Sequence, residues 1–115
     1  MILTNRLRFI NLGQQAFEEQ LTPFEDLNKA FENKVRLGVM SILVVNEFKD
    51  FNGLKELLQV TDGNLASHIK SLEKLEYVDV EKKFVDRKPR TEYRVTELGR
   101  LAFKKHIAAI EKLLR

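Results

Sequence analysis

The chain has 115 residues, with no cysteine, no tryptophan and only two histidines. Without cysteine it can form no disulfide, no thiol redox switch and no thiolate metal site. Histidines and carboxylates are nowhere clustered at metal-ligand spacing, and no glycine-rich phosphate loop is present. We therefore expect a protein that is not an enzyme and that has no catalytic residues, no metal site and no cofactor.

Long apolar runs are also missing. The most apolar stretch, residues 35–45, contains Arg36 and is too short to cross a bilayer. The first residues include early arginines but no continuous apolar segment followed by a cleavage site. We expect a cytoplasmic protein with no membrane partner.

The composition is that of one folded domain, with 43% hydrophobic and 32% charged residues. The formal net charge is only +3, but it is unevenly distributed. Between residues 82 and 94 only two residues are acidic, Asp86 and Glu92. The basic residues of this stretch are Lys82, Lys83, Arg87, Lys88, Arg90 and Arg94. Such a local excess of positive charge predicts contact with a polyanion.

Residues 52–78 predict two helices joined by a tight turn. Three leucines give the first helix one apolar face: Leu54, Leu57 and Leu58. Asn52 can cap this helix, because its side-chain oxygen accepts a hydrogen bond from a free backbone N–H. Residues 60–63 end it, and Thr61 or Asp62 can cap the second helix.

The second helix has two faces of opposite character. Its apolar positions share one side: Leu65, Ile69, Leu72 and Leu75. The opposite side is small, polar and basic: Gly63, Ser67, Lys70 and Lys74, with Asn64 and Ser71 on a shoulder and His68 near the boundary. Such a side suits a helix that enters the DNA major groove, where Gly63 would allow close approach. An ordinary solvated face is the alternative.

Further elements are predicted on both sides of this pair. An apolar stripe predicts a helix over 4–20, and a capping box at Thr22-Pro23-Phe24-Glu25 predicts a short helix to about Ala30. Asn33 can cap a helix to about residue 46, with core-facing Val35, Val39, Ile42 and Leu43 flanked by Met40. Two strands, 77–81 and 93–95, enclose a loop, 84–91, in which Pro89 breaks the pairing. Thr96 can cap an apolar helix to about residue 114, with His106 only partly buried.

The segment LKELLQVTDGNLASHIKSLEKLEYVDVEKKFVDRKPRTEYRVTELGR resembles the winged helix-turn-helix of bacterial transcriptional regulators in the MarR/ArsR-like group. The likeness runs from about Asn33 to Arg100 and includes the order helix, turn, helix, hairpin and the final T-E-L-G-R. It implies one mainly α domain with a small β-hairpin (α+β), over residues 1–115. The parts would be an N-terminal helical extension (1–21), the winged core (33–95) and a C-terminal dimerisation helix (96–115).

The resemblance implies a homodimer, joined through its N- and C-terminal helices, that binds a pseudo-palindromic operator in double-stranded DNA. Residues 62–76 would be the recognition helix in the major groove, and the wing, 77–95, would contact phosphates or the minor groove. The candidate DNA contacts are Asn64, Ser67, His68, Lys70, Ser71, Lys82, Lys83, Arg87, Lys88 and Arg90, with Lys55 as a possible addition. Asn64 suits a capping role equally well, and His68 also suits the seam between the two helices. Such relatives also imply a small-molecule effector and a short strand, containing Phe51, that joins the sheet of the wing.

Two points stay open. Similar regulators usually have glycine where this chain has Glu76; a left-handed Glu76 costs about 1 kcal/mol, and a helix that ends one residue later is the alternative. The winged helix could also be a protein–protein interaction module without specific DNA binding, since fold alone does not fix function. Continuity of the polar face of residues 62–76 with the basic wing would favour DNA.

Overall fold

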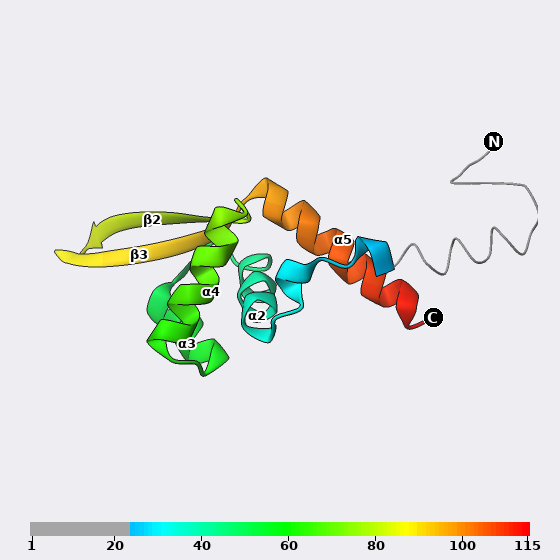
Figure 1. Ribbon diagram of the computed structural model, residues 1–115. Helices are drawn as coiled ribbons and strands as arrows, with labels where there is room; N and C mark the ends of the chain where they lie inside the picture. The colour runs from blue at the N-terminus through cyan, green and yellow to red at the C-terminus, as the bar shows by residue number, and fades with distance from the viewer. Residues whose placement is uncertain (1–23) are drawn as a thin grey trace, which may run out of the picture. The chain divides into compact units, whose positions relative to one another are not determined.

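The computed structural model describes residues 24–115 (Figure 1). The helix predicted over 4–20 and the capping residues Thr22 and Pro23 lie outside this range. The described residues divide into two compact units, Asn28–Lys104 and a second unit that contains residues 24–27 and 105–115. Each unit is described by itself.

The first unit is a winged helix, with its elements in the predicted order. They are η1 (Lys29–Phe31), α2 (Lys34–Leu43), β1 (Lys49–Asp50), α3 (Phe51–Leu58), α4 (Asp62–Lys74), β2 (Val78–Val85), β3 (Lys88–Val95) and the start of α5 (Glu97–Leu113). Three strands form one antiparallel sheet in the order β1-β3-β2. This confirms the α+β class predicted from the sequence.

The core lies where α2, α3 and α4 pack together. Its fully buried members include Val39, Met40, Leu43, Leu54, Leu65, Ile69 and Leu72. Gly38 lets α2 and α3 approach closely, because a Cβ there would lie 2.6 Å from Cδ2 of Leu58. Leu57 and Leu75, predicted on the apolar faces, are instead 58% and 45% exposed. Met40 is fully buried rather than flanking the core, while Ile42 is only half-buried.

Short-range capping explains where the helices begin. As predicted, Oδ1 of Asn33 accepts from the backbone N–H of Val35, and Thr61 caps α4. The predicted cap at Asn52 is wrong: Asp50 caps α3, its Oδ1 accepting from the N–H of Gly53 at 2.8 Å. The prediction that Phe51 lies in a strand is wrong too, because Phe51 begins the helix and the third strand, Lys49–Asp50, ends just before it.

Two predicted helix ends are also corrected. The helix expected to reach Ala30 stops early, because Oδ1 of Asn28 accepts from the N–H of Ala30 and starts the 3-10 helix η1. This turn buries Phe31, whose ring centroid lies 5.5 Å from that of Tyr77 and 5.4 Å from that of Phe103. The helix α2 ends at Leu43 rather than near residue 46.

The wing is a regular hairpin rather than two short strands around a loop. Its ladder extends to the pair Val85 and Lys88, and the two-residue turn consists of Asp86 and Arg87, both with positive φ (53° and 66°). These angles are typical of a type I′ turn. The prediction that Pro89 breaks the pairing is wrong. Pairs alternate in an antiparallel ladder, so Pro89 lies opposite Phe84 in a non-hydrogen-bonded pair, where no N–H is required.

The end of α4 and the start of α5 meet at the base of the wing. Glu76 is left-handed (φ 63°), and the N–H of Tyr77 donates to the carbonyl of Leu72 at 3.0 Å, so the alternative of a longer helix is wrong. Oγ1 of Thr96 donates to the carbonyl of Glu76 and accepts from the N–H of Gly99. A Cβ on Gly99 would overlap the backbone of Tyr77, which explains the glycine in T-E-L-G-R.

Thr96 caps α5, as predicted. Several apolar side chains of this helix and of the residue after it are exposed: Leu98, Leu101, Leu113 and Leu114. In the second unit, His106 is only 3% exposed, which contradicts the prediction of partial burial; it lies on the same side of α5 as buried Ala109, three residues on. Nζ of Lys105 lies 3.5 Å from Oδ1 of Asp26. No helix among residues 24–115 is long and apolar enough to cross a membrane.

Candidate nucleic-acid interface

The exposed side of α4 carries the polar residues that the sequence placed there. Asn64, Ser67 and Lys70 are exposed, while Leu65 and Ile69 behind them are buried. A Cβ added to Gly63 would meet nothing within 4 Å, so the first turn of α4 is open. The backbone at this end of the helix can therefore come close to a ligand.

Asn64 does not cap its helix. The cap is Thr61, whose Oγ1 accepts from the backbone N–H of Asn64 at 3.2 Å. The exposed amide of Asn64 has no hydrogen-bond partner within the described residues. It therefore keeps its donors and its acceptor available for another molecule.

His68 and Ser71 each form a hydrogen bond to another residue of the chain. Nδ1 of His68 lies 3.0 Å from Nη1 of Arg36, whose Nε donates to the carbonyl of Ala30. Because a guanidinium can only donate, Nδ1 is the acceptor and a neutral ring has its proton on Nε2. Oγ of Ser71 donates to the carbonyl of Ser67 at 3.3 Å. The structure thus places His68 at the seam between α2 and α4.

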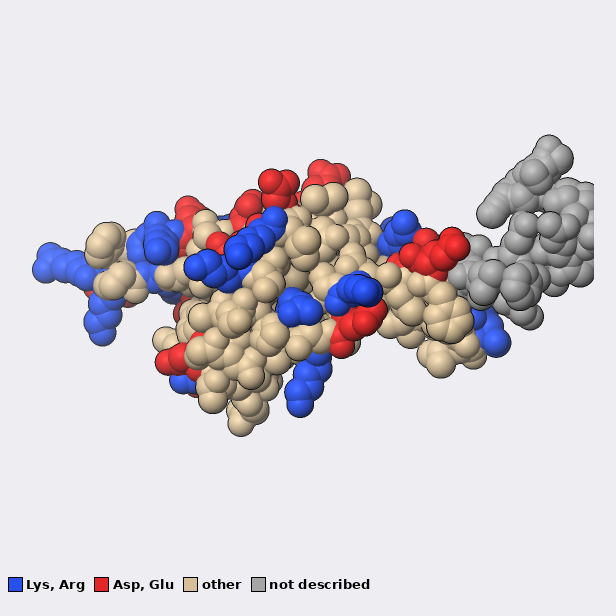
Figure 2. All heavy atoms as spheres, viewed as in Figure 1, with Lys and Arg blue, Asp and Glu red and all other residues tan. Residues whose placement is uncertain are grey.

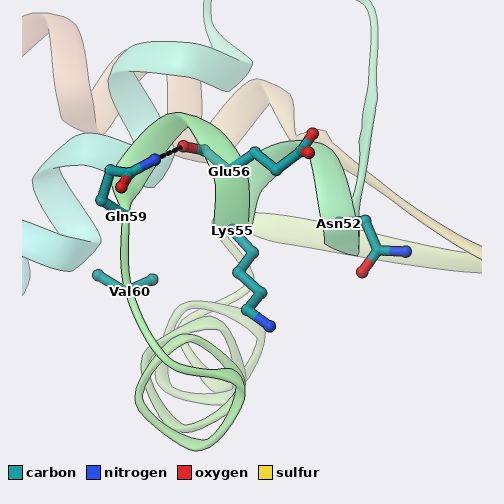
Figure 3. Close-up of a pocket in the computed structure, with 5 residues that line it drawn as sticks. All are labelled: Asn52, Lys55, Glu56, Gln59 and Val60. Atoms are coloured by element: carbon teal, nitrogen blue, oxygen red, sulfur yellow. Dashed lines mark hydrogen bonds between the residues drawn. The ribbon is translucent and has the colours of Figure 1, made fainter.

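Lys55 forms an ion pair at the turn between the two helices. Its Nζ lies 2.8 Å from Oδ1 of Asp62, the first residue of α4. Beside it, a shallow surface hollow is lined by Asn52, Lys55, Glu56, Gln59 and Val60 (Figure 3). Gln59 is left-handed and donates from Nε2 to the carbonyl of Glu56. Lys55 is therefore paired with a carboxylate, unlike the cations at the end of the wing.

The wing's cations fall into two groups, and one of them surrounds Glu92. This carboxylate is 2% exposed, with Lys83, Arg90 and Arg94 at 3.1, 3.4 and 3.8 Å. Two further carboxylates pair with the same cations: Asp50 with Arg90, and Glu81 with Lys83 and Arg94. We call these six residues the Glu92 cluster. Its three positive and three negative charges balance.

The other group is at the far end of the hairpin. Lys82, Arg87 and Lys88 are exposed, and none of them lies within 4.0 Å of a carboxylate in the described part of the chain. Figure 2 shows lysine and arginine side chains gathered along the hairpin and at its end. The sequence correctly indicated a basic wing, but its unpaired charge is confined to this end.

Phe84 was not among the residues predicted to contact DNA, and it is 77% exposed near the turn. The period of two along β2 places it on the same face as Lys82 and Val80, and that alternation was the available signal. With Pro89 opposite it, we define the wing tip as Lys82, Phe84, Arg87, Lys88 and Pro89.

At the base of the wing, β3 contributes the buried Tyr93. This residue is 8% exposed, and burial, followed by the negative charge of Glu73, raises the pKa of its phenol. Tyr93 therefore stays protonated at neutral pH, and its phenol lies near enough to α4 to be affected by the charge of Glu73. α4 and the hairpin belong to one packed unit.

Comparisons with known proteins agree with this geometry. The family model of the winged helix DNA-binding domain matches residues 35–114. Uncharacterized protein MJ0432 of Methanocaldococcus jannaschii is 39% identical over 85 residues, 74% of this chain and 92% of its own. The transcriptional regulator homologue protein from Pyrococcus horikoshii OT3 is 31% identical, with a TM-score of 0.74, covering 84% of this chain and 94% of that one.

A more distant solved structure shares the fold. The apo form of wild-type MarR from E. coli has a TM-score of 0.62 at 16% identity, covering 90% of this chain and 78% of that one. The resemblance seen in the sequence is confirmed. The chain belongs to the winged helix DNA-binding domain family and has the fold of the MarR-like transcriptional regulators, a group of DNA-binding proteins and not of enzymes.

Proposed function

We propose that the protein is a sequence-specific transcriptional regulator that binds double-stranded DNA as a homodimer in the cytoplasm. α4 enters the major groove, and the wing tip contacts phosphates or the adjacent minor groove. One observation supports this most: the exposed polar side of α4 and the unpaired cations of the wing tip belong to the same packed unit.

The proposed contacts differ in kind. Asn64 and Ser67 are placed for base edges, and Lys70 for a base edge or a nearby phosphate. The wing tip contributes Lys82, Arg87 and Lys88 to phosphates. His68 and Ser71 have partners inside the protein, so we assign them a positioning role in α4. Lys83 and Arg90, held in the Glu92 cluster, shape the wing rather than neutralise phosphate.

Exposed apolar residues on α5 support the homodimer. Leu98 and Leu101 are 51% and 59% exposed and lie three residues apart, on one side of the helix. Burying such a stripe against a second copy would create a two-fold axis and two equivalent recognition helices. The operator is then a pseudo-palindrome whose half-sites are separated by about one helical turn, roughly 34 Å.

Selection of binding sites from random duplexes, at two salt concentrations, tests this proposal. We expect enrichment of a pseudo-palindrome. If a dimer neutralises about eight phosphates, log K falls with log salt with a slope near −7. Absence of both enrichment and salt-dependent binding would refute the proposal and favour the alternative, a protein–protein interaction module.

Control by a small-molecule effector is a further part of the proposal, drawn from the family. Linkage makes it testable: a compound that changes operator affinity by some factor must bind the DNA-bound protein with affinity changed by the same factor. Screening by thermal shift finds compounds that bind the protein, and operator titration with and without each hit measures the change in operator affinity. A compound that binds but leaves the operator affinity unchanged is not an effector.

A further inference from the structure

We infer that the wing inserts an apolar wedge, the side chain of Phe84 backed by Pro89, into the minor groove of the bound duplex and so bends the DNA. The inference rests on the proposed function, because it concerns the same complex. It adds a second mode of recognition, in which DNA deformability contributes to sequence preference.

The wedge is built by the register of the hairpin. Phe84 and Pro89 form a non-hydrogen-bonded pair, the kind in which facing side chains lie closest. Both are exposed, Phe84 to 77%, and the two-residue turn that follows keeps the end of the hairpin narrow. A proline ring has little conformational freedom, so it gives the phenyl ring a stiff neighbour.

A single exposed apolar residue needs no explanation, but Phe84 is not isolated. Val80, on the same face of β2, is 40% exposed, and Lys82 lies between the two in sequence. Toward the tip this face therefore alternates apolar and basic side chains and ends in Phe84.

The positive charge of the wing tip indicates that the wedge contacts DNA rather than a second copy of the chain. Lys82 lies on the same face as Phe84, Arg87 lies in the turn beyond it, and Lys88 lies on the opposite face. None of the three has a carboxylate within 4.0 Å in the described residues, and the only acid among residues 82–91 is Asp86. Figure 2 shows uncharged surface between lysine and arginine side chains at the end of the hairpin. An apolar pair with cations beside it and at the turn complements a groove lined by phosphates with a base stack at its floor. A second copy of the same tip would be repelled by like charge.

The dimensions of DNA then point to the minor groove. The major groove, about 12 Å wide, admits a helix or a two-stranded ribbon, whereas the minor groove is about 6 Å wide. Since α4 occupies the major groove in the proposed complex, the wing reaches a neighbouring groove that its two strands cannot enter. Only side chains from its tip fit there, and Phe84 is the largest of them.

The test uses the full chain and a duplex recovered by the selection described above, labelled at its ends for energy transfer. Phe84→Ala should weaken affinity about tenfold and reduce the DNA bend, which an intercalating wedge sets at roughly 20° or more. The salt slope should stay unchanged, because no charge is removed. Phe84→Leu should keep most of the bend, since leucine is also an effective wedge.

The matched control is Val45→Ala, which truncates an equally exposed side chain (78%) outside the wing. Circular dichroism and thermal unfolding verify that each variant is folded. Phe84→Ala binding and bending like the wild type would overturn the wedge and leave the regulator intact. Loss of self-association with unchanged bending would overturn it too. Failure of the wild type to bind any duplex would instead refute the proposed function.

Discussion

Nζ of Lys83 lies 3.1 Å from Oε1 of Glu92, across the hairpin from one strand to the other. The carboxylate also faces Arg90 and Arg94, so one buried acid holds three of the wing's cations. The aromatic ring of Phe48 adds to this arrangement, because Nζ of Lys83 and Cζ of Arg94 lie 5.9 and 5.2 Å from its centroid. The wing therefore has two parts: the Glu92 cluster, which has a structural role, and the wing tip, whose cations are free to contact DNA.

The substitution Glu92→Gln tests the structural role of the Glu92 cluster. Removing the buried charge should lower the free energy of unfolding by about 1–2 kcal/mol, less than for a fully buried pair because the cations are partly exposed. The freed cations should tighten binding to mixed-sequence duplexes and steepen the salt slope by about one. Urea unfolding and fluorescence anisotropy measure the two effects. Glu81→Gln, at a 54% exposed carboxylate facing two of the same cations, should change stability by less than about 0.5 kcal/mol.

The double substitution Arg87→Ala with Lys88→Ala tests the free half. Both side chains are exposed and unpaired, so stability should change by no more than about 0.5 kcal/mol. Binding to every duplex should weaken, and the salt slope should become shallower by about one for each lost phosphate contact. Anisotropy titrations at several salt concentrations give the slope. An unchanged slope would show that the wing tip does not touch phosphate.

Gly63→Ala should affect operator affinity without lowering the stability of the fold. The added Cβ meets nothing in the protein, and alanine favours a helix, so stability should stay the same or rise by up to about 1 kcal/mol. If the α4 backbone approaches the base edges closely, operator affinity should nevertheless fall about tenfold or more. Gly99→Ala is the counterpart: its Cβ would overlap the Tyr77 backbone, and thermal unfolding should show a loss of roughly 2–4 kcal/mol. Full operator affinity in Gly63→Ala would rule out close approach there.

Leu98→Ser combined with Leu101→Ser should weaken the proposed dimer. Both side chains are more than half exposed, so the fold should lose little while an apolar contact with a second copy is lost. Sedimentation velocity should show a shift toward monomer, and operator affinity should fall at least tenfold as the two half-sites lose linked binding. Leu57→Ser, at a similarly exposed leucine of α3, should leave the mass unchanged. A dimer that persists in the double variant would place its interface elsewhere.

The raised pKa of Tyr93 predicts how the free energy of unfolding changes at alkaline pH. Burial and Glu73 raise the pKa of this phenol above its ordinary value of 10.0, so the folded state holds its proton more tightly than the unfolded state. This stabilisation is fully present below pH 10 and is lost as the pH rises through the folded-state pKa. Tyr93→Phe, which cannot ionise, should therefore lose less stability between pH 8 and 10.5 in urea unfolding. An identical alkaline loss in wild type and variant would contradict this account.

Some of the fold follows from short stretches of the chain. The caps at Asn33, Thr61 and Thr96 each depend on a side chain and a backbone N–H two or three residues away, so local sequence was sufficient to place them. The buried side of α4 follows from its helical period. The polar side opposite it was predicted for the same reason, and its DNA contacts remain predictions.

The sequence by itself determined the helix-turn-helix, the order of the elements and the family, because these depend on periodicity and capping within a few residues. Only the tertiary structure decided which charges are free. The hairpin register brings Lys83 and Arg94 to Glu92, and a contact over 32 residues brings His68 to Arg36. A count of charges along the chain cannot reveal such pairing, since ion pairs depend on distances that arise only when strands and helices pack.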